Sequence, residues 1–179
     1  MSSQPTTPFQ SARELIKSRL AGAIRGTLYQ PGKIVLQYRI SGGPPGKRLL
    51  RVLRISGEGE VTYEDHDELR RRKPIRAKTT MPVSEGMAVL REVEGSGLLN
   101  LRETGGGFLP DSIIGSIGIE IDGAEVQFHF LADEDQVRSQ RKETLPPIRE
   151  LRIKFEALCE RVRKIAKKQP RETKGKKRR

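Results

Sequence analysis

Residues 113–130 read IIGSIGIEIDGAEVQFHF, and this stretch decides the fold. Apolar residues alternate with other residues on both sides of Asp122-Gly123, which is the pattern of half-buried strands. An Asp-Gly pair between two such runs is the strongest short signal for a β-hairpin, because both turn residues take positive φ angles. The stretch therefore predicts two antiparallel strands joined by a tight turn.

The same alternation predicts two strands upstream. Residues 33–41, KIVLQYRIS, form the first of them, and residues 49–56 form the second, where Arg51 interrupts the apolar face. The glycine- and proline-rich residues 42–46 between them predict a loop.

A third strand follows after a turn at residues 57–59, and it begins with Val61 and Tyr63. Residues 64–78 then change character, because an acidic run is followed directly by a basic run. Opposite charges this close in sequence can pair with each other, so we predict an exposed loop or edge here rather than a core element.

Two helices are predicted around these strands. Residues 11–25 have an apolar stripe at helical spacing, Ser11 and Glu14 have the spacing of a capping box, and Gly26 predicts the end of the helix. Residues 84–94 predict a shorter helix that ends at Gly95 in the left-handed conformation. A short strand is predicted next, from Leu98, Leu99 and Leu101.

A long helix is predicted from Pro146-Pro147 onward, because proline suits the first turn of a helix. Its apolar positions follow a helical period from Ile148 to Ile165. The elements together predict an α+β fold, with an antiparallel sheet of about five to six strands, an N-terminal amphipathic helix and a long C-terminal helix packed on the sheet.

Charge is concentrated at the two ends of the chain. Residues 160–179 carry eleven Lys and Arg against two acids, and residues 1–30 carry four against one. These ends account for the whole formal charge of +12, so residues 31–159 are neutral, with 20 basic and 20 acidic residues. We therefore predict a polar leader and amphipathic helix at 1–30, a single α+β domain at 31–166 and a disordered basic tail at 167–179.

The single cysteine, Cys159, excludes an internal disulfide and fits a reducing compartment, so we expect a cytoplasmic protein. The composition of residues 1–30 leaves an organellar transit peptide open, and the basic tail leaves nuclear import open. No apolar stretch approaches the length of about 20 residues that a membrane span needs.

No catalytic constellation is visible, and we expect the protein not to be an enzyme. His129 lies within a predicted strand, His66 lies in a charged segment, and Cys159 falls on the apolar side of the last helix. Zinc sites usually take four Cys or His ligands, which these three separated residues do not supply. The acidic residues 133–135 lack the spacing of a calcium loop. We therefore expect no catalytic residue, no metal and no cofactor.

Two glycine-rich stretches are candidates for contact with a partner. Neither has the Lys-Ser or Lys-Thr pair of a phosphate-binding loop, so turn geometry is the alternative explanation for both. Glycine-rich loops also present backbone to a binding partner, and the candidate partner-binding residues are Gly42, Gly43, Gly46, Gly105, Gly106 and Gly107.

The basic tail is the strongest functional signal in the sequence. Its charges suit phosphates, an acidic protein surface or anionic lipid, and a tail that only adds solubility is the alternative. The candidate residues for phosphate or an acidic partner are Lys167, Lys168, Arg171, Lys174, Lys176, Lys177, Arg178 and Arg179.

A family resemblance is carried by short pieces in a fixed order: Tyr38-Arg39-Ile40-Ser41-Gly42-Gly43, Ser56-Gly57-Glu58-Gly59, Ser96-Gly97-Leu98-Leu99, Ile117–Ile121 before Asp122-Gly123, and Pro147, Leu151, Phe155 and Leu158. On these pieces, residues 36–159 resemble a family of small α+β proteins that includes the emfourin-type inhibitors of thermolysin-like metalloproteases. The resemblance implies peptidase inhibition through protein contacts, but it assigns no inhibitory residue. The N-terminal helix, residues 70–73 and the basic tail fall outside it.

We therefore expect a non-catalytic binding module that acts through protein–protein contacts, of a peptidase-inhibitor type if the resemblance holds, with a basic tail for acidic partners. The alternative is a nucleic-acid or ribonucleoprotein-associated protein anchored by its basic C-terminus. The chain has no Trp and an aromatic content of 4%, which argues against a stacking platform for single-stranded nucleic acid.

Overall fold

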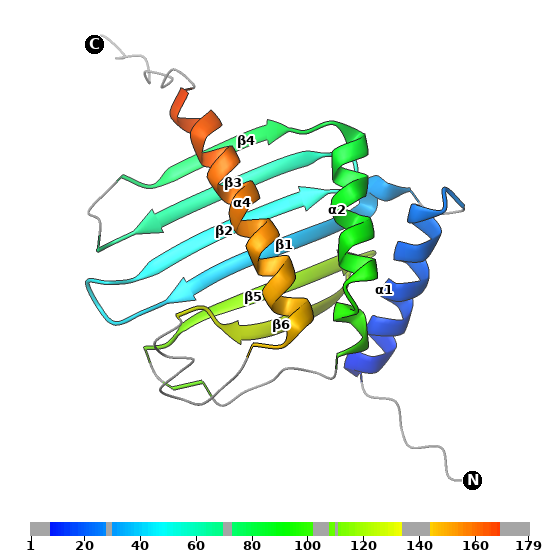
Figure 1. Cartoon of the computed structure of the whole chain (residues 1–179), viewed down its shortest axis with the longest axis horizontal. Helices are drawn as coiled ribbons and strands as arrows, with labels where there is room; N and C mark the ends of the chain where they lie inside the picture. The colour runs from blue at the N-terminus through cyan, green and yellow to red at the C-terminus, as the bar shows by residue number, and fades with distance from the viewer. Residues whose placement is uncertain are drawn as a thin grey trace, which may run out of the picture.

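The computed structural model describes residues 8–27, 30–69, 73–101, 108–109, 111–133 and 144–168. Its centre is an antiparallel sheet of six strands in the order β4-β3-β2-β1-β5-β6 (Figure 1). The strands are β1 (Ile34–Gly42), β2 (Leu49–Ser56), β3 (Glu60–Asp67), β4 (Ile75–Thr80), β5 (Ile113–Ile121) and β6 (Ala124–Leu131). The sheet confirms the α+β class and the upper end of the predicted number of strands.

The predicted hairpin is confirmed as β5 and β6. Its turn residues Asp122 and Gly123 have φ angles of 51° and 78°, as a two-residue turn with positive φ at both positions requires. The register places Ile119 opposite Val126, so the two apolar runs share one face of the sheet.

Strand β1 lies in the middle of the sheet and sets the register for both halves. Tyr38 is opposite Leu53 on β2 and opposite Ile117 on β5, so the apolar alternations of the three strands coincide. Because the side-chain period of a strand is two, this register gathers the apolar residues on one face and leaves the intervening residues on the other.

Within the described residues, three helices accompany the sheet: α1 (Pro8–Ile24), α2 (Val83–Gly95) and α4 (Pro146–Lys168). Short 3-10 turns lie at η1 (Pro31–Lys33) and η2 (Leu98–Asn100). Helix α4 runs obliquely across one face of the sheet, and α1 and α2 lie side by side near one end of the strands (Figure 1). The described part of residues 1–30 thus packs into the domain, because Ile16 and Leu20 are fully buried in the core.

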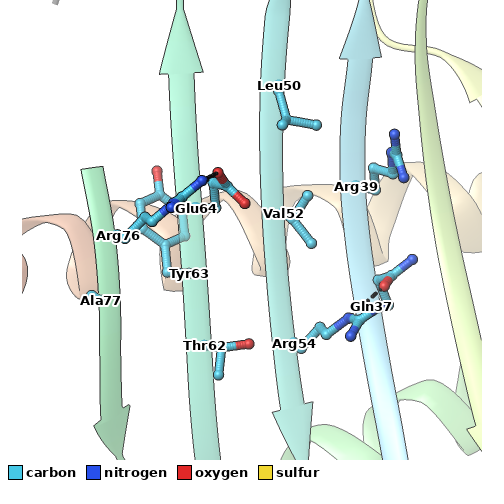
Figure 2. A pocket seen from close by; sticks show the side chains of 10 residues that line it. All are labelled: Gln37, Arg39, Leu50, Val52, Arg54, Thr62, Tyr63, Glu64, Arg76 and Ala77. Carbon is cyan, nitrogen blue, oxygen red and sulfur yellow. Dashed lines mark hydrogen bonds and ion pairs between the residues drawn. The ribbon is translucent and has the colours of Figure 1, made fainter. Parts of the chain in front are cut away.

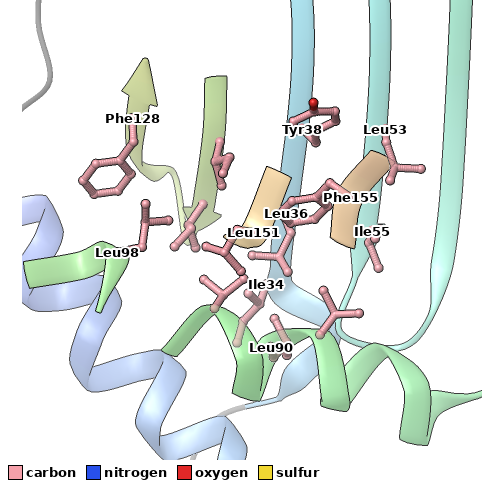
Figure 3. Close-up of a cluster of buried hydrophobic side chains, with 14 of the residues drawn as sticks. Ile34, Leu36, Tyr38, Leu53, Ile55, Leu90, Leu98, Phe128, Leu151 and Phe155 are labelled. Atoms are coloured by element: carbon pink, nitrogen blue, oxygen red, sulfur yellow. The ribbon is translucent and has the colours of Figure 1, made fainter. Parts of the chain in front are cut away.

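Among the described residues, the main hydrophobic cluster lies on one face of the sheet. Phe155 and Leu151 of α4 and Leu90 of α2 pack against strand residues such as Leu36 and Leu53 (Figure 3). The strands contribute only every second residue to this cluster, all from the same side of the sheet. We call this side the covered face and the other side the open face.

Two predicted boundaries are wrong. Helix α1 begins at Pro8 rather than Ser11, so Ser11 lies inside the helix and does not cap it. Gly95 is the last residue of α2, and the left-handed glycine is Gly97, with a φ of 78°. Helix α1 therefore starts earlier than predicted, and the left-handed glycine that follows α2 lies further along the chain than predicted.

The predicted short strand at Leu98, Leu99 and Leu101 is also wrong. Residues Leu98–Asn100 form the 3-10 turn η2 instead. Leu98 and Leu99 are both buried, which neighbouring residues of a strand with one exposed face cannot be, because their side chains point to opposite faces.

Residues 64–78 are only partly as predicted. Strand β4 is an edge strand, which was one of the two predicted alternatives, an exposed loop or an edge. Strand β3, however, continues into this segment as far as Asp67. Asp65 alternates in phase with Val61 and Tyr63, so it points into the covered face and is 5% exposed. The expectation that no part of this segment reaches the core is therefore wrong.

Candidate functional site

The open face of the sheet carries a hollow at its centre. The hollow has a volume of about 500 Å³ and spans strands β1 to β4 (Figure 2). We call it the central hollow, and its lining residues are Gln37, Arg39, Leu50, Val52, Arg54, Thr62, Tyr63, Glu64, Arg76 and Ala77. It is open to solvent because all three described helices pack on the covered face.

Polar contacts between neighbouring strands hold the walls of the central hollow. Arg54 Nε donates to Gln37 Oε1 at 2.7 Å, and these residues are register partners on β2 and β1. Arg76 Nη2 and Nε donate to Glu64 Oε1 at 2.9 and 3.0 Å across β4 and β3. Exposed pairs of this kind add little stability, so their main effect is to fix where the side chains lie.

The floor of the central hollow is apolar. Leu50 and Val52 are half-buried on β2, between the polar pairs, with exposed Arg39 opposite Val52 on β1. Three arginines and one glutamate line the hollow, a net charge of +2. An apolar floor with a positive rim suits a protein segment that presents aliphatic side chains beside carboxylates.

The sequence did not single out the central hollow. Its residues are the polar members of the strand alternation and look like ordinary solvent-facing positions. The one signal for this hollow in the sequence was that Leu50 and Val52 share a face of the strand with basic residues. The pairs between neighbouring strands can be identified only once the register of the strands is known.

The candidate glycines of residues 42–46 lie at the last position of β1 and in the connection from β1 to β2. Gly42, Gly43 and Gly46 have φ angles of 121°, 98° and 78°. A Cβ on Gly42 would lie 2.1 Å from the carbonyl oxygen of Ser112, and one on Gly43 would lie 2.7 Å from that of Lys47. Gly42 and Gly43 are therefore required because other backbone atoms pass too close for a Cβ. A Cβ on Gly46 would contact no other atom. Gly105, Gly106 and Gly107 lie outside the described residues.

The candidate basic residues divide at the end of α4. Lys167 and Lys168 are exposed in its last turn, where positive charge also complements the helix dipole. The other six candidates lie beyond the described residues: Arg171, Lys174, Lys176, Lys177, Arg178 and Arg179.

A buried ionic cluster lies under α4 on the covered face. Asp65 forms an ion pair through each of its carboxylate oxygens: Arg51 Nε lies 3.5 Å from Oδ1, and Arg163 Nε lies 3.5 Å from Oδ2. Arg163 also donates to Glu160 at 3.2 Å. The sequence showed Arg51 as an interruption of an apolar face, which was the signal for a buried partner on the next strand.

Cys159 lies near this cluster and is 1% exposed. Burial raises the pKa of its thiol to about 12, since the surrounding protein cannot solvate a thiolate. The group is therefore protonated at neutral pH, as expected for a thiol that packs as a small apolar side chain.

A second network holds the other half of α4. Tyr38 donates from its hydroxyl to Glu156 Oε1 at 3.0 Å, and Arg152 Nε donates to the same oxygen at 3.0 Å. The Tyr38 ring stacks on Phe155 with the ring centroids 5.4 Å apart. Burial, then the nearby Glu156 carboxylate, raises the pKa of Tyr38 well above its ordinary value.

The histidines are not brought together. His66 on β3 and His129 on β6 both belong to the open face, but three strands separate them. Within the described residues, no group of three or more His, Cys, Asp or Glu side chains is arranged to hold a metal ion.

Comparison with known proteins adds no relative: no model of a protein family matches the chain, and no curated protein sequence matches it. Among the described helices, none is both long and apolar enough to cross a membrane.

Proposed function

We propose that this protein is a non-catalytic binding module that holds a protein partner on the open face of its sheet. The central hollow carries this proposal, because it combines an apolar floor with side chains already fixed by Arg54–Gln37 and Arg76–Glu64 contacts. Fixed side chains lose little conformational freedom on binding, which favours affinity.

The chemistry of the hollow favours a protein over a single-stranded nucleic acid. Among the described open-face residues of β1–β4, none is a Phe, Tyr or Trp that could stack on a base. Tyr63 borders the hollow, but its side chain is buried in the core on the covered face. Leu50 and Val52 supply apolar contact, while Arg39 supplies an exposed cation for a carboxylate. The single buried Cys159 is consistent with a reducing compartment, which supports our proposal of a cytoplasmic location.

The resemblance to emfourin-type inhibitors makes a thermolysin-like metallopeptidase the first partner to test. We expect the full chain to bind the peptidase and to slow cleavage of a peptide substrate. Arg39→Glu reverses the exposed charge at the hollow and should weaken the complex at least about tenfold, as loss of a central interface contact does.

Arg149→Glu is the matched control. This substitution makes the same change of charge at an exposed position of α4, which packs on the covered face of the sheet. It should leave binding unchanged. If the full chain neither binds the peptidase nor slows its cleavage of the substrate, the protein is not an inhibitor of this class. If Arg39→Glu and Arg149→Glu weaken binding equally, the open face is not the binding surface.

A further inference from the structure

Strand β4 forms one edge of the sheet, and the two edges are not equivalent (Figure 1). At the opposite edge, α1 contacts β6, and Phe128 and His129 of β6 have further contacts of their own within the protein. Among the described residues, the hydrogen bonds and ion pairs of β4 all go to β3. The outer side of β4 is therefore the edge that has no partner in the described part of the chain.

The register shows which backbone groups of β4 point outward. The amide of Met81 donates to the carbonyl oxygen of Gly59 at 2.8 Å, and this pair continues the β3–β4 register. In an antiparallel pair of strands, hydrogen-bonded residue pairs alternate with pairs that are not hydrogen-bonded. Every second residue of β4 therefore directs its N–H and C=O groups away from β3. We call these the outer residues, and they are Arg76, Lys78 and Thr80.

The neighbouring pair of strands gives the same assignment. The amide of Glu68 donates to the carbonyl oxygen of Arg48 at 3.0 Å, and this pair continues the β2–β3 register. The even-numbered residues of β3 therefore direct their backbone groups to β2, and the odd-numbered ones direct theirs to β4. Because Tyr63 lies opposite Ala77, the odd-numbered residues of β4 complete those bonds. The even-numbered outer residues are left with a row of donors and acceptors, which is a template for another strand.

The side chains of β4 indicate what kind of strand would fit. Arg76 and Lys78 lie on the open face, and their side chains are 79% and 72% exposed although each has an acidic neighbour on β3. Ile75 and Ala77 lie on the covered face and pack against the core. A strand added beside β4 would have the same period of two. It would therefore place acids beside the basic pair and aliphatic residues beside the apolar pair.

We propose that the outer side of β4 docks an extended segment of a partner protein in which acidic and aliphatic residues alternate. Hydrogen bonds to the outer residues supply affinity, and the two rows of side chains select the sequence of the segment. This inference goes beyond the proposed function, because it assigns a backbone edge and a sequence pattern rather than the central hollow. Lys78 and Thr80 do not line that hollow.

The same charges oppose pairing of β4 with a second copy of the chain. If two β4 strands paired antiparallel about Lys78, the two copies of this lysine would lie opposite each other. Like charges in that position are destabilising, and basic residues on edge strands guard against such pairing. An acidic segment meets the opposite situation, so the edge discriminates between the two occupants.

Amide hydrogen exchange of the full chain, followed residue by residue by NMR, tests the assignment. The probe is a capped peptide of alternating glutamate and valine with the six-residue length of β4. Without the peptide, the amides of the outer residues should exchange faster than those of Ala77 and Thr79, which point to β3. With the peptide bound, the outer amides should exchange at least about tenfold more slowly, while those of Ala77 and Thr79 stay unchanged.

A proline substitution tests the backbone contact by itself. Lys78→Pro removes one outward N–H, and an edge strand tolerates proline where the nitrogen faces away from the sheet. Lys78→Gln is the matched control, because it removes the same charge and keeps the N–H. In fluorescence anisotropy with labelled peptide, Lys78→Pro should bind about fivefold more weakly than Lys78→Gln.

Thr80→Pro repeats the comparison without a change of charge, with Thr80→Ala as its control. Urea unfolding establishes that each variant is folded before its binding is compared. Arg39→Glu should bind the peptide as the unmodified chain does, so a failure of the central hollow and a failure of the β4 edge are separate results.

Four results would overturn the proposal. The first is outer amides that exchange as slowly as that of Ala77 without peptide, since the edge would then already be covered. The second is no added protection by the peptide, or proline variants that bind as their controls do. The third is equal binding of an alternating lysine–valine peptide. The fourth is protection that rises with the concentration of the protein alone, which would make a second copy the occupant.

Discussion

Arg163 Nε lies 3.5 Å from Asp65 Oδ2, and this contact joins the C-terminal half of α4 to the second half of β3. Both side chains are less than a tenth exposed, and Arg51 contacts the other oxygen of the same carboxylate. Because this one buried carboxylate lies between a buried guanidinium group and a partly buried one, its removal leaves positive charge that water reaches poorly.

Asp65→Asn should therefore destabilise the protein by about 3–5 kcal/mol, the cost of breaking a buried ion pair from one side. Urea unfolding measures the change. Glu64→Gln is the control one residue away, because its pair with Arg76 lies on the open face and should contribute no more than about 1 kcal/mol. Equal costs for the two variants would contradict the assignment of Asp65 to a buried cluster.

The two buried tyrosines should respond differently to loss of the hydroxyl. Tyr38→Phe removes the donor to Glu156 and should cost about 1–2 kcal/mol in the free energy of unfolding. Tyr63 Oη is buried and has no hydrogen-bond partner among the described residues, so Tyr63→Phe should be neutral or stabilising. A larger loss of stability from Tyr63→Phe than from Tyr38→Phe would contradict the hydrogen bonding assigned to the two hydroxyl groups.

Cys159 should make the protein less stable as the pH rises above about 9. The folded-state pKa of its thiol is about 12, against an ordinary value of 9.0, so only the unfolded chain loses the proton between these values. The resulting loss of stability from about pH 8 to about pH 10 is about 1.4 kcal/mol.

Cys159→Ala should remove this contribution, so its free energy of unfolding should fall less steeply over the same pH interval. Urea unfolding of both proteins at the two pH values gives the comparison. Identical pH dependence in the two proteins would show that the thiol does not titrate differently on folding.

The glycines of the β1–β2 connection should differ in their tolerance of a methyl group. Gly42→Ala combines a φ of 121° with a Cβ 2.1 Å from the Ser112 carbonyl oxygen, and it should cost about 3 kcal/mol or more. Gly46→Ala faces open space and should cost only the left-handed conformation, about 1–2 kcal/mol. Thermal unfolding ranks the two, and the opposite order would refute the close approach at Gly42.

The sequence predicted most of the elements, because alternation and turn residues report local structure directly. The hairpin around Asp122-Gly123, strand β2 and the long helix from Pro146 follow from such local signals. Two predictions that depended on tertiary packing were wrong. Asp65 was predicted to be exposed because it lies in a run of charged residues, although it alternates in phase with the buried residues of β3. Residues Leu98–Asn100 were predicted as a strand from the spacing of the leucines alone, and they form the 3-10 turn η2.

The central hollow could not be predicted, for a similar reason. Gln37 and Arg54 become neighbours through the β1–β2 register, and Glu64 and Arg76 through the β3–β4 register. A sequence shows that these residues face solvent. It does not show which of them lie opposite each other, or that the described helices all pack on the other face of the sheet. The glycine loops were visible locally, and for that reason they were favoured as candidates.

The most direct test of the account is photo-crosslinking to the metallopeptidase from the two sides of the sheet. Val52→benzoylphenylalanine places the reactive group in the central hollow, and Ile153→benzoylphenylalanine places it on the exposed side of α4, where Ile153 is 66% exposed. We expect crosslinks from position 52 and none from position 153. Crosslinks from position 153 alone would contradict the claim that the open face of the sheet binds the partner.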